Sequence, residues 1–171
     1  MIVKADFYTV VKNALDDYTN GAYKQEKNAP RHMSIMASAM KSYLEDNLVI
    51  SYAWAATNPA TGVVDPVVSF NSTVTFTTFS IISPQTKVGL ASQVQASVMT
   101  GIITHAAGFT IPPGSFLPLP LVLPSETDAT KAFMNTIISP IYDWIKTLVN
   151  VTPISGAHAA FTGAATMASI S

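Results

Sequence analysis

The sequence predicts an α+β fold with two N-terminal helices, a long antiparallel β-hairpin or small sheet, two further helices, an extended proline-rich segment and a C-terminal arm. Apolar residues recur at helical spacing over residues 5–19 and 30–48, but alternate with polar residues over residues 67–82. Five prolines within residues 111–124 exclude a continuous helix there. We therefore expect one domain over residues 1–149, which includes the proline-rich segment, and an arm over residues 150–171.

Two amphipathic helices are expected at the start of the chain. The first covers residues 5–19 and ends at Asn20 and Gly21, which tolerate the left-handed backbone of a helix end. Its apolar stripe consists of Phe7, Val10, Val11, Ala14 and Tyr18. The second helix starts near Pro30, and its stripe consists of Met33, Met36, Ala37, Met40, Tyr43, Leu44, and Asn47 or Leu48.

Two strands follow, joined by a loop over residues 57–66. Residues 49–56 place Ile50, Tyr52 and Trp54 on one face of the first strand. The second strand covers residues 67–82, and its alternation changes phase near residues 77–78, which predicts a β-bulge. Sixteen extended residues would span roughly 53 Å, whereas a domain of this size is about 40 Å across, so the strand must bend or project.

The rest of the chain predicts two helices and two extended segments. A helix over residues 86–104 buries Leu90, Val94, Val98 and Ile102, and residues 111–124 then follow a polyproline-like path. A last helix over residues 126–149 is expected to kink at Pro140. Its stripe consists of Ala129, Phe133, Ile137, Ile141, Trp144, Ile145 and Leu148. Residues 150–171 read as an arm that docks elsewhere or as a loose terminus.

Charge is distributed unevenly along the chain. Thirteen of the nineteen charged residues lie in residues 1–66, and residues 88–125 and 147–171 contain none. A soluble monomer usually keeps about a quarter of its surface charged, so this C-terminal region must be covered by its own domain, by lipid or by a partner. The prolines within residues 98–123 prevent a continuous membrane helix, which makes the lipid alternative the weakest.

The residues that carry chemistry form no recognisable site. The chain has no cysteine, and its histidines, His32, His105 and His158, lie far apart in the sequence, with His105 expected at a helix end. The glycines match neither a phosphate loop nor a serine-hydrolase elbow, and the one basic run is interrupted by Glu26. We therefore predict no catalytic, cofactor-binding or metal-ligating residue, no cofactor, and no sequence-specific nucleic-acid binding.

Residues 32–82 resemble small virion structural proteins of tailed bacteriophages. The similarity lies in a helix that ends Tyr43–Asn47, an aromatic strand Ser51–Trp54, the loop Asn58–Pro66, and the strand Val67–Thr78. The resemblance implies a non-enzymatic subunit of the virion, assembled in the host cytoplasm and located in the neck, tail or baseplate. It also implies that the partners are copies of the chain and other virion proteins, not a membrane.

Such a subunit would form a ring or symmetric array through apolar contacts, and a neighbour's strand would complete its small sheet. The candidate interface residues are apolar side chains of the proline-rich segment and of the arm, although the former could also cross the protein's own core. They are Ile111, Phe116, Leu117, Leu119, Leu121, Val122, Leu123, Phe161, Met167 and Ile170. The alternatives are a capsid-decorating or fibre-associated module and, less favoured, a membrane-active protein.

Overall fold

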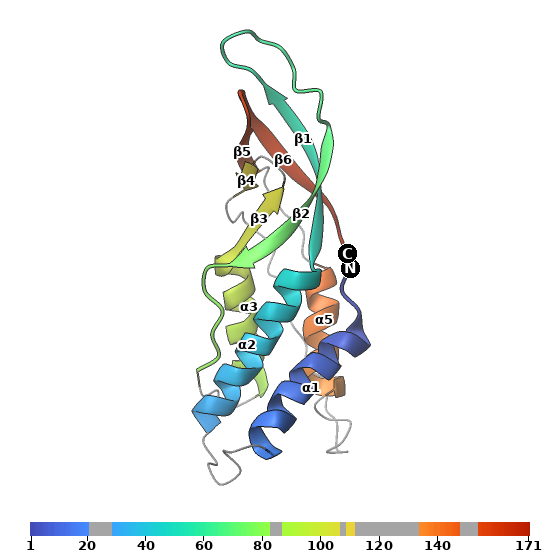
Figure 1. The fold of residues 1–171 in the computed structure, drawn as a ribbon, viewed down its shortest axis with the longest axis vertical. Coiled ribbons are helices and arrows are strands. Elements are labelled where there is room, and N and C mark those ends of the chain that lie inside the picture. The colour runs from blue at the N-terminus through green and yellow to red at the C-terminus, as the bar shows by residue number, and fades with distance from the viewer. Residues whose placement is uncertain (21–28, 83–86, 107–108, 112–133, 148–153) are drawn as a thin grey trace.

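The computed structural model describes residues 1–20, 29–82, 87–106, 109–111, 134–147 and 154–171. The fold is α+β, as the sequence predicts, and the molecule is elongated, with its helices at one end and its sheet at the other (Figure 1). We call the helices, with the segment 77–82 that runs beside them, the helical half. The strands and the loop 58–68 are the sheet half.

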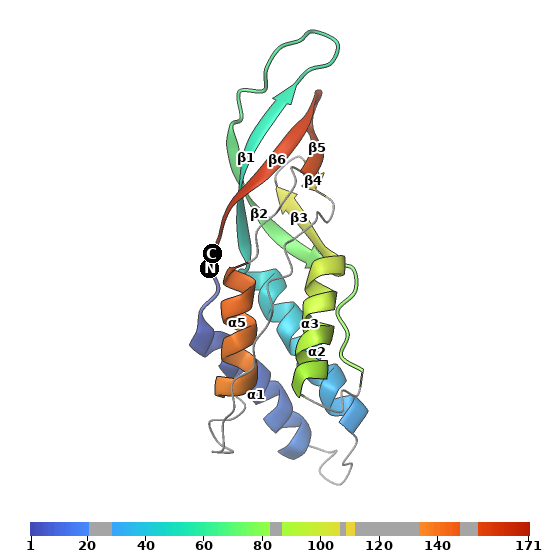
Figure 2. The ribbon, with the colours of Figure 1, turned by 180° about the vertical axis from the view of Figure 1, so that it is seen from behind.

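In the described part of the chain, six strands form one sheet in the order β4-β3-β2-β1-β6-β5, with every neighbouring pair antiparallel. They are β1 (Val49–Thr57), β2 (Ser69–Phe76), β3 (Ile102–Ala106), β4 (Phe109–Ile111), β5 (Ile154–His158) and β6 (Phe161–Ile170). The sheet curls until its two outermost strands, β4 and β5, contact each other (Figure 2). The described sheet is thus larger than the two strands that the sequence predicts, and its completion by a neighbour's strand stays a prediction.

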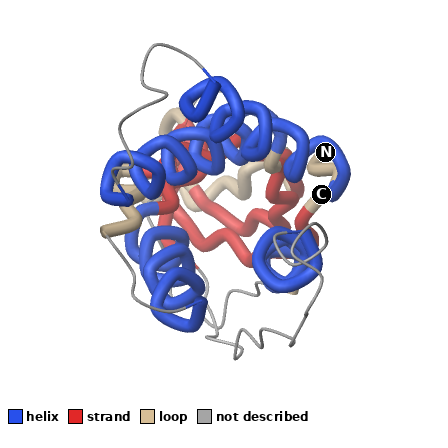
Figure 3. The backbone as a smooth tube through the Cα atoms, turned by 90° about the horizontal axis from the view of Figure 1, so that it is seen from below, coloured by secondary structure: helices blue, strands red, loops and turns tan. Residues whose placement is uncertain are grey.

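The helical half contains α1 (Lys4–Asn20), α2 (Ala29–Asn47), α3 (Lys87–Gly101) and α5 (Ser139–Lys146). Seen along the long axis, these helices surround the region where the strands lie (Figure 3). Phe7 and Val11 of α1 are buried against α2, with the rings of Phe7 and Tyr43 centred 5.2 Å apart. Val10, however, is 39% exposed, so the stripe of α1 is narrower than predicted.

The second helix and the first strand agree with the sequence. On α2, Met36, Met40 and Leu44 are buried, and β1 buries Ile50, Tyr52 and Trp54 on one face. These residues belong to one continuous core that joins the two halves, together with side chains of α1, α3, α5, β2, β3 and β6. Apolar burial of this kind, at roughly 25 cal/mol per Å², is the main force that holds the sheet on the helices.

The strand expected over residues 67–82 is too long, because β2 ends at Phe76. At that point the Thr77 N–H donates to the Gly101 carbonyl at 2.7 Å, and residues 77–82 leave the sheet to run beside α3. The phase change marks the end of the strand and not a bulge. We call residues 77–82 the strap.

The third helix is shorter than predicted. It ends at Gly101, where an added Cβ would lie 2.4 Å from the Thr78 carbonyl oxygen, so close packing of the strap requires glycine here. Ile102 is buried as expected, but it lies in β3. His105 is therefore a strand residue that pairs with Thr73, and the prediction that it ends a helix is wrong.

The last helix is described only over residues 134–147. A π-helical turn, Met134–Ile138, leads directly into α5, with Pro140 in the first turn of that helix. A kink is expected at Pro140, and the helix is irregular there in the form of a π-helical turn just before the proline. Proline lacks the N–H that a regular helix needs. Ile141, Trp144 and Ile145 are buried as predicted, while the other expected residues of the helix, 126–133 and 148–149, lie outside the described residues.

The C-terminal residues differ most from expectation. Residues 154–171 are not an arm, because β5 and β6 form a hairpin and β6 pairs with β1 from Ile50 to Thr57. Ser171 exchanges two backbone hydrogen bonds of 2.9 Å with Val49 at the start of β1. The two ends of the chain lie side by side (Figures 1 and 2). The backbone pairs of β6 give this uncharged segment an ordered place inside its own molecule.

Candidate functional site: the uncharged sheet half and its anchored loop

The outward face of the three central strands, β2, β1 and β6, carries only small uncharged side chains. Alternation along each strand sends one set of residues into the core and the other set outward. The exposed residues are Ala53, Ala55, Thr57, Ser69, Asn71, Thr73, Thr75, Thr162, Thr166, Ala168 and Ser169. They present methyl, hydroxyl and one amide group to the surroundings, on a face without long flexible side chains.

Charge separates in space more sharply than it does in the sequence. Among the described residues, every charged side chain except Asp65 belongs to a helix. Asp65 itself is only 3% exposed, so the described surface of the sheet half presents no Asp, Glu, Lys or Arg. The helical half, by contrast, has exposed ion pairs such as Lys4–Asp143 and Lys12–Asp16.

The loop between β1 and β2 projects beyond the end of the sheet (Figure 1). Its turn is closed by the N–H groups of Gly62 and Asn58, which donate at 2.8 Å to the carbonyls of Asn58 and Val63 respectively. Gly62 has φ +70°, a left-handed conformation that glycine adopts without strain. The turn leaves Val63, Val64 and Val68 between 57% and 70% exposed, which groups three apolar side chains on one loop.

Asp65 fixes this loop to the sheet. Its Oδ2 accepts a 2.9 Å hydrogen bond from the Trp54 indole N–H and lies 3.1 Å from Nδ1 of His158, while its Oδ1 accepts from the Val67 N–H at 3.0 Å. The Asp65 N–H donates to the Ala56 carbonyl at 2.9 Å. We call Trp54, Asp65, Val67 and His158 the Asp65 cluster; it connects the first strand, the loop and β5.

The electrostatics of the Asp65 cluster favour an ionised carboxylate. Burial works to raise the pKa of Asp65, but the hydrogen bonds from Val67, His158 and Trp54 outweigh it and lower the pKa below its ordinary value of 3.8. Both carboxylate oxygens have partners: Oδ2 contacts the side chains of Trp54 and His158, and Oδ1 accepts from the backbone of Val67. The arrangement therefore acts as a structural anchor for the loop.

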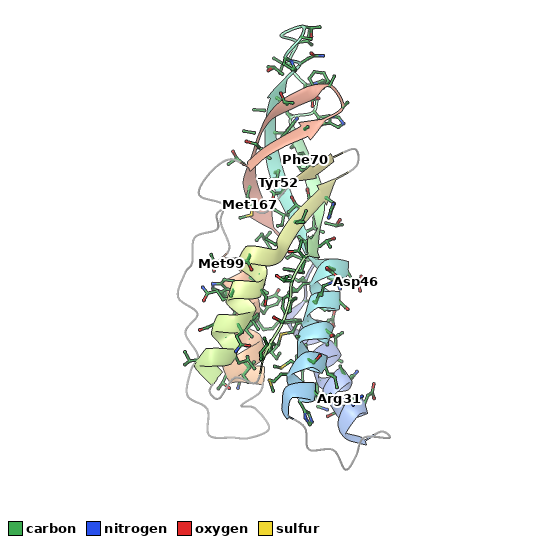
Figure 4. The ribbon with its side chains drawn as sticks, turned by 90° about the vertical axis from the view of Figure 1, so that its left-hand side faces the viewer. Arg31, Asp46, Tyr52, Phe70, Met99 and Met167 are labelled. Atoms are coloured by element: carbon green, nitrogen blue, oxygen red, sulfur yellow. The ribbon has the colours of Figure 1, made fainter. Side chains whose placement is uncertain are left out.

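Below the anchor, aromatic rings stack inside the curled sheet. The ring centres of Tyr52 and Phe70 are 5.3 Å apart, and Trp54 meets Phe70 edge-on at 6.1 Å. Tyr52, Phe70 and Met167 gather in this part of the sheet half, away from the ends of α2 marked by Arg31 and Asp46 (Figure 4). Burial raises the pKa of Tyr52 above its usual 10.0, which keeps its hydroxyl neutral. This packing supports the outward face from behind.

The predicted interface residues fall into two groups. Phe161, Met167 and Ile170 lie on β6, half-buried and packed against the molecule's own core, which accounts for their apolar character without a neighbour. Ile111 is the last residue of β4. The remaining six, Phe116, Leu117, Leu119, Leu121, Val122 and Leu123, lie outside the described residues, and their place in an interface stays a prediction.

Sequence reasoning missed the Asp65 cluster and the outward face. From the sequence, Asp65 is only a residue of the loop 57–66, and His158 is only one of three widely spaced histidines. A signal did exist, since Asp65 is the one charged residue between Asp46 and Lys87. The outward face required the register of β6 on β1, and these strands are more than a hundred residues apart in sequence.

Searches for other kinds of site over the described residues gave negative results. No cluster of His, Cys, Asp or Glu in that part of the chain is arranged to hold a metal ion. No described helix is long and apolar enough to cross a membrane. Comparison with protein-family models, with curated proteins and with solved structures finds no match to this chain.

Proposed function

We propose that the protein is a structural subunit of a tailed-phage virion, located in the neck, tail or baseplate, and that it assembles into a ring or symmetric array through its sheet half. The observation that carries this proposal is the absence of exposed charge from the described part of the sheet half. The resemblance of residues 32–82 to virion proteins supports the choice of particle.

Desolvation explains why an uncharged face suits a protein contact. Removing an ion from water costs several kcal/mol unless it finds a partner in the interface, and this cost limits how much charged surface an interface centre can contain. The outward face of β2, β1 and β6 has no such ion to bury. The same face on a second copy is equally free of charge, so copies can meet without leaving a charge unpaired.

The size of the face indicates that the loop takes part in the contact. Eight residues at ~3.3 Å and three strands at ~4.8 Å give about 380 Å² of flat sheet. A stable interface takes about 800 Å² from each partner, so the three strands alone are too small. The exposed valines of the loop, Val63, Val64 and Val68, add apolar area next to the face, and we expect them to lie in the same contact.

Location in the particle can be tested directly. We expect mass spectrometry of purified virions to detect the protein, and electron microscopy of particles made without it to show heads and tails that fail to join or tails that are incomplete. Virions that lack the protein entirely, or complete infectious particles formed without it, would overturn the proposal.

A capsid-decorating or fibre-associated module is the second candidate. It is favoured by the charged helical half, because a displayed module needs one well-solvated end. Particles made without the protein distinguish the two candidates, since a decorating module leaves joined heads and tails. The membrane-active alternative predicts flotation with phosphatidylcholine and phosphatidylglycerol liposomes, whereas we expect the protein to stay at the bottom of the gradient.

A further inference from the structure

The strap uses only one of its two backbone edges. The Ser80 N–H donates to Oγ of Ser97 at 3.1 Å, and the Ser97 hydroxyl donates back to the Ser80 carbonyl at 3.2 Å. The Gln93 amide makes the same two-way contact with the backbone of Ile82. Two extended residues advance ~6.6 Å and four helical residues ~6 Å, so alternate residues of the strap match successive turns of α3.

The other edge of the strap belongs to Phe79 and Ile81. Among the hydrogen bonds of the described residues, none involves the backbone N–H or C=O of either residue. In an extended segment these groups point opposite to those of Ser80 and Ile82, and therefore away from α3 and toward α2. A row of unpaired donors and acceptors at this spacing is the chemistry that another extended backbone recognises.

A hollow lies on that same side of the strap. It has a volume of about 310 Å³ and is lined by Ser34, Ala37 and Ser38 of α2 and by residues 79–82. Its lining contains no charged residue, with Ala37 and Ile81 buried and the serines exposed. Small residues on α2 leave room for a backbone to lie beside the strap. Glu45, further along α2 and outside this lining, accepts from the Phe76 N–H at 2.8 Å.

We propose that the groove between the strap and α2 binds an extended, uncharged peptide segment of another protein by strand addition, with Phe79 and Ile81 as its backbone partners. The bound segment must keep its N–H groups, so proline is excluded at the paired positions. Side chains directed at Ala37 must be uncharged, because the hollow offers them no counter-charge. This inference does not depend on the sheet half or on a place in a virion.

A synthetic heptapeptide of alternating serine and valine, blocked at both ends, is a suitable probe. We expect the backbone amide signals of Phe79 and Ile81 to shift in ¹⁵N-resolved NMR spectra on titration, and their hydrogen exchange to slow about tenfold in the complex. The same peptide N-methylated at every residue keeps its side chains but loses its donors, and we expect it not to bind. Equal binding of the two peptides, or unmoved Phe79 and Ile81 amides at millimolar peptide, would overturn the proposal.

Two exposed serines of α2 provide matched variants. Ser38→Arg fills the hollow and introduces a charge, and we expect it to weaken peptide binding about tenfold or more. Ser42→Arg lies one turn further along α2, outside the lining, and should bind the peptide like the unmodified protein. Unchanged amide spectra elsewhere in both variants establish that they are folded. Equal binding by the two variants would place the peptide elsewhere and contradict the proposed groove.

Discussion

The two halves of this molecule differ in the side chains that they expose. The helical half follows the usual pattern, in which amphipathic helices bury one face and cover the other with ions such as Lys12, Asp16 and Asp17. The sheet half also buries its inward face, but among its described residues it exposes only uncharged side chains. The described residues of one chain thus form a charged surface at one end and an uncharged surface at the other.

This difference is not visible in the sequence as a simple division. The strand β1 and the loop that follows it belong to the sheet half although they lie in the more charged part of the chain, and α5 belongs to the helical half although it lies in the less charged part. The strands come from three separated stretches that the fold brings together. Charge segregation in this protein is a property of the tertiary structure.

The largest expected effect comes from the junction of β6 with β1. A Cβ added at Gly163 would lie 2.0 Å from the Ala55 carbonyl oxygen, so Gly163→Ala must push apart two central strands. We expect it to lower the free energy of unfolding by about 3 kcal/mol in urea denaturation. Gly62→Ala is the matched control, since the site is open and only its φ of +70° is unfavourable, at a cost of about 1 kcal/mol. Equal stability of the two variants would contradict the close packing of β6.

The next effect tests the Asp65 cluster. Asp65→Ala removes the acceptor of the Trp54 and Val67 N–H groups, so the loop keeps only its backbone hydrogen bonds to the sheet. We expect amide exchange in residues 58–68 to accelerate about tenfold, with α1 and α2 unaffected. Asp16→Ala, which breaks an exposed ion pair of the helical half, should change stability by no more than about 0.5 kcal/mol. If amide exchange in residues 58–68 is as slow in Asp65→Ala as in the unmodified protein, the Asp65 side chain does not hold the loop in place.

A smaller effect is expected from acid. Because the folded state lowers the pKa of Asp65 below 3.8, its carboxylate stabilises the fold above about pH 4, and this contribution disappears as pH falls through the lowered pKa. We therefore expect the free energy of unfolding of the unmodified protein to exceed that of Asp65→Asn at pH 7. Between pH 7 and pH 2, this difference should disappear only at the acidic end. A constant difference between the two proteins over this range would contradict the direction of the shift.

Helices and strands could be predicted from the sequence where the signal is local. The stripes of α2 and the inward residues of β1 are confirmed, because helix and strand periodicity is written into neighbouring residues. The sequence alone did not predict the structure where contacts between distant segments determine it. The chain leaves the sheet after Phe76 because Gly101 accepts from Thr77, and the last residues form a hairpin because β1 offers them a free edge.

The candidate site was predictable only in outline. The shortage of charge drew attention to the C-terminal region, but its residues Phe161, Met167 and Ile170 are half-buried against the core. The uncharged face consists of alanine, serine, threonine and one asparagine instead. Hydropathy draws attention to large apolar side chains, whereas an interface can also consist of small polar ones. Which of these side chains point outward follows only from the sheet register.

The molar mass of the isolated protein tests the central claim most directly. By light scattering at micromolar concentration, we expect an oligomer well above the 18.2 kDa of one chain. The double variant Thr73→Lys/Thr166→Lys adds charge to the outward face and should shift the molar mass toward that of the monomer. The control Asn13→Lys, on the exposed face of α1, should leave the molar mass unchanged. A stable 18.2 kDa monomer for the unmodified protein, or identical masses for all three proteins, would contradict the assembly role of the sheet half.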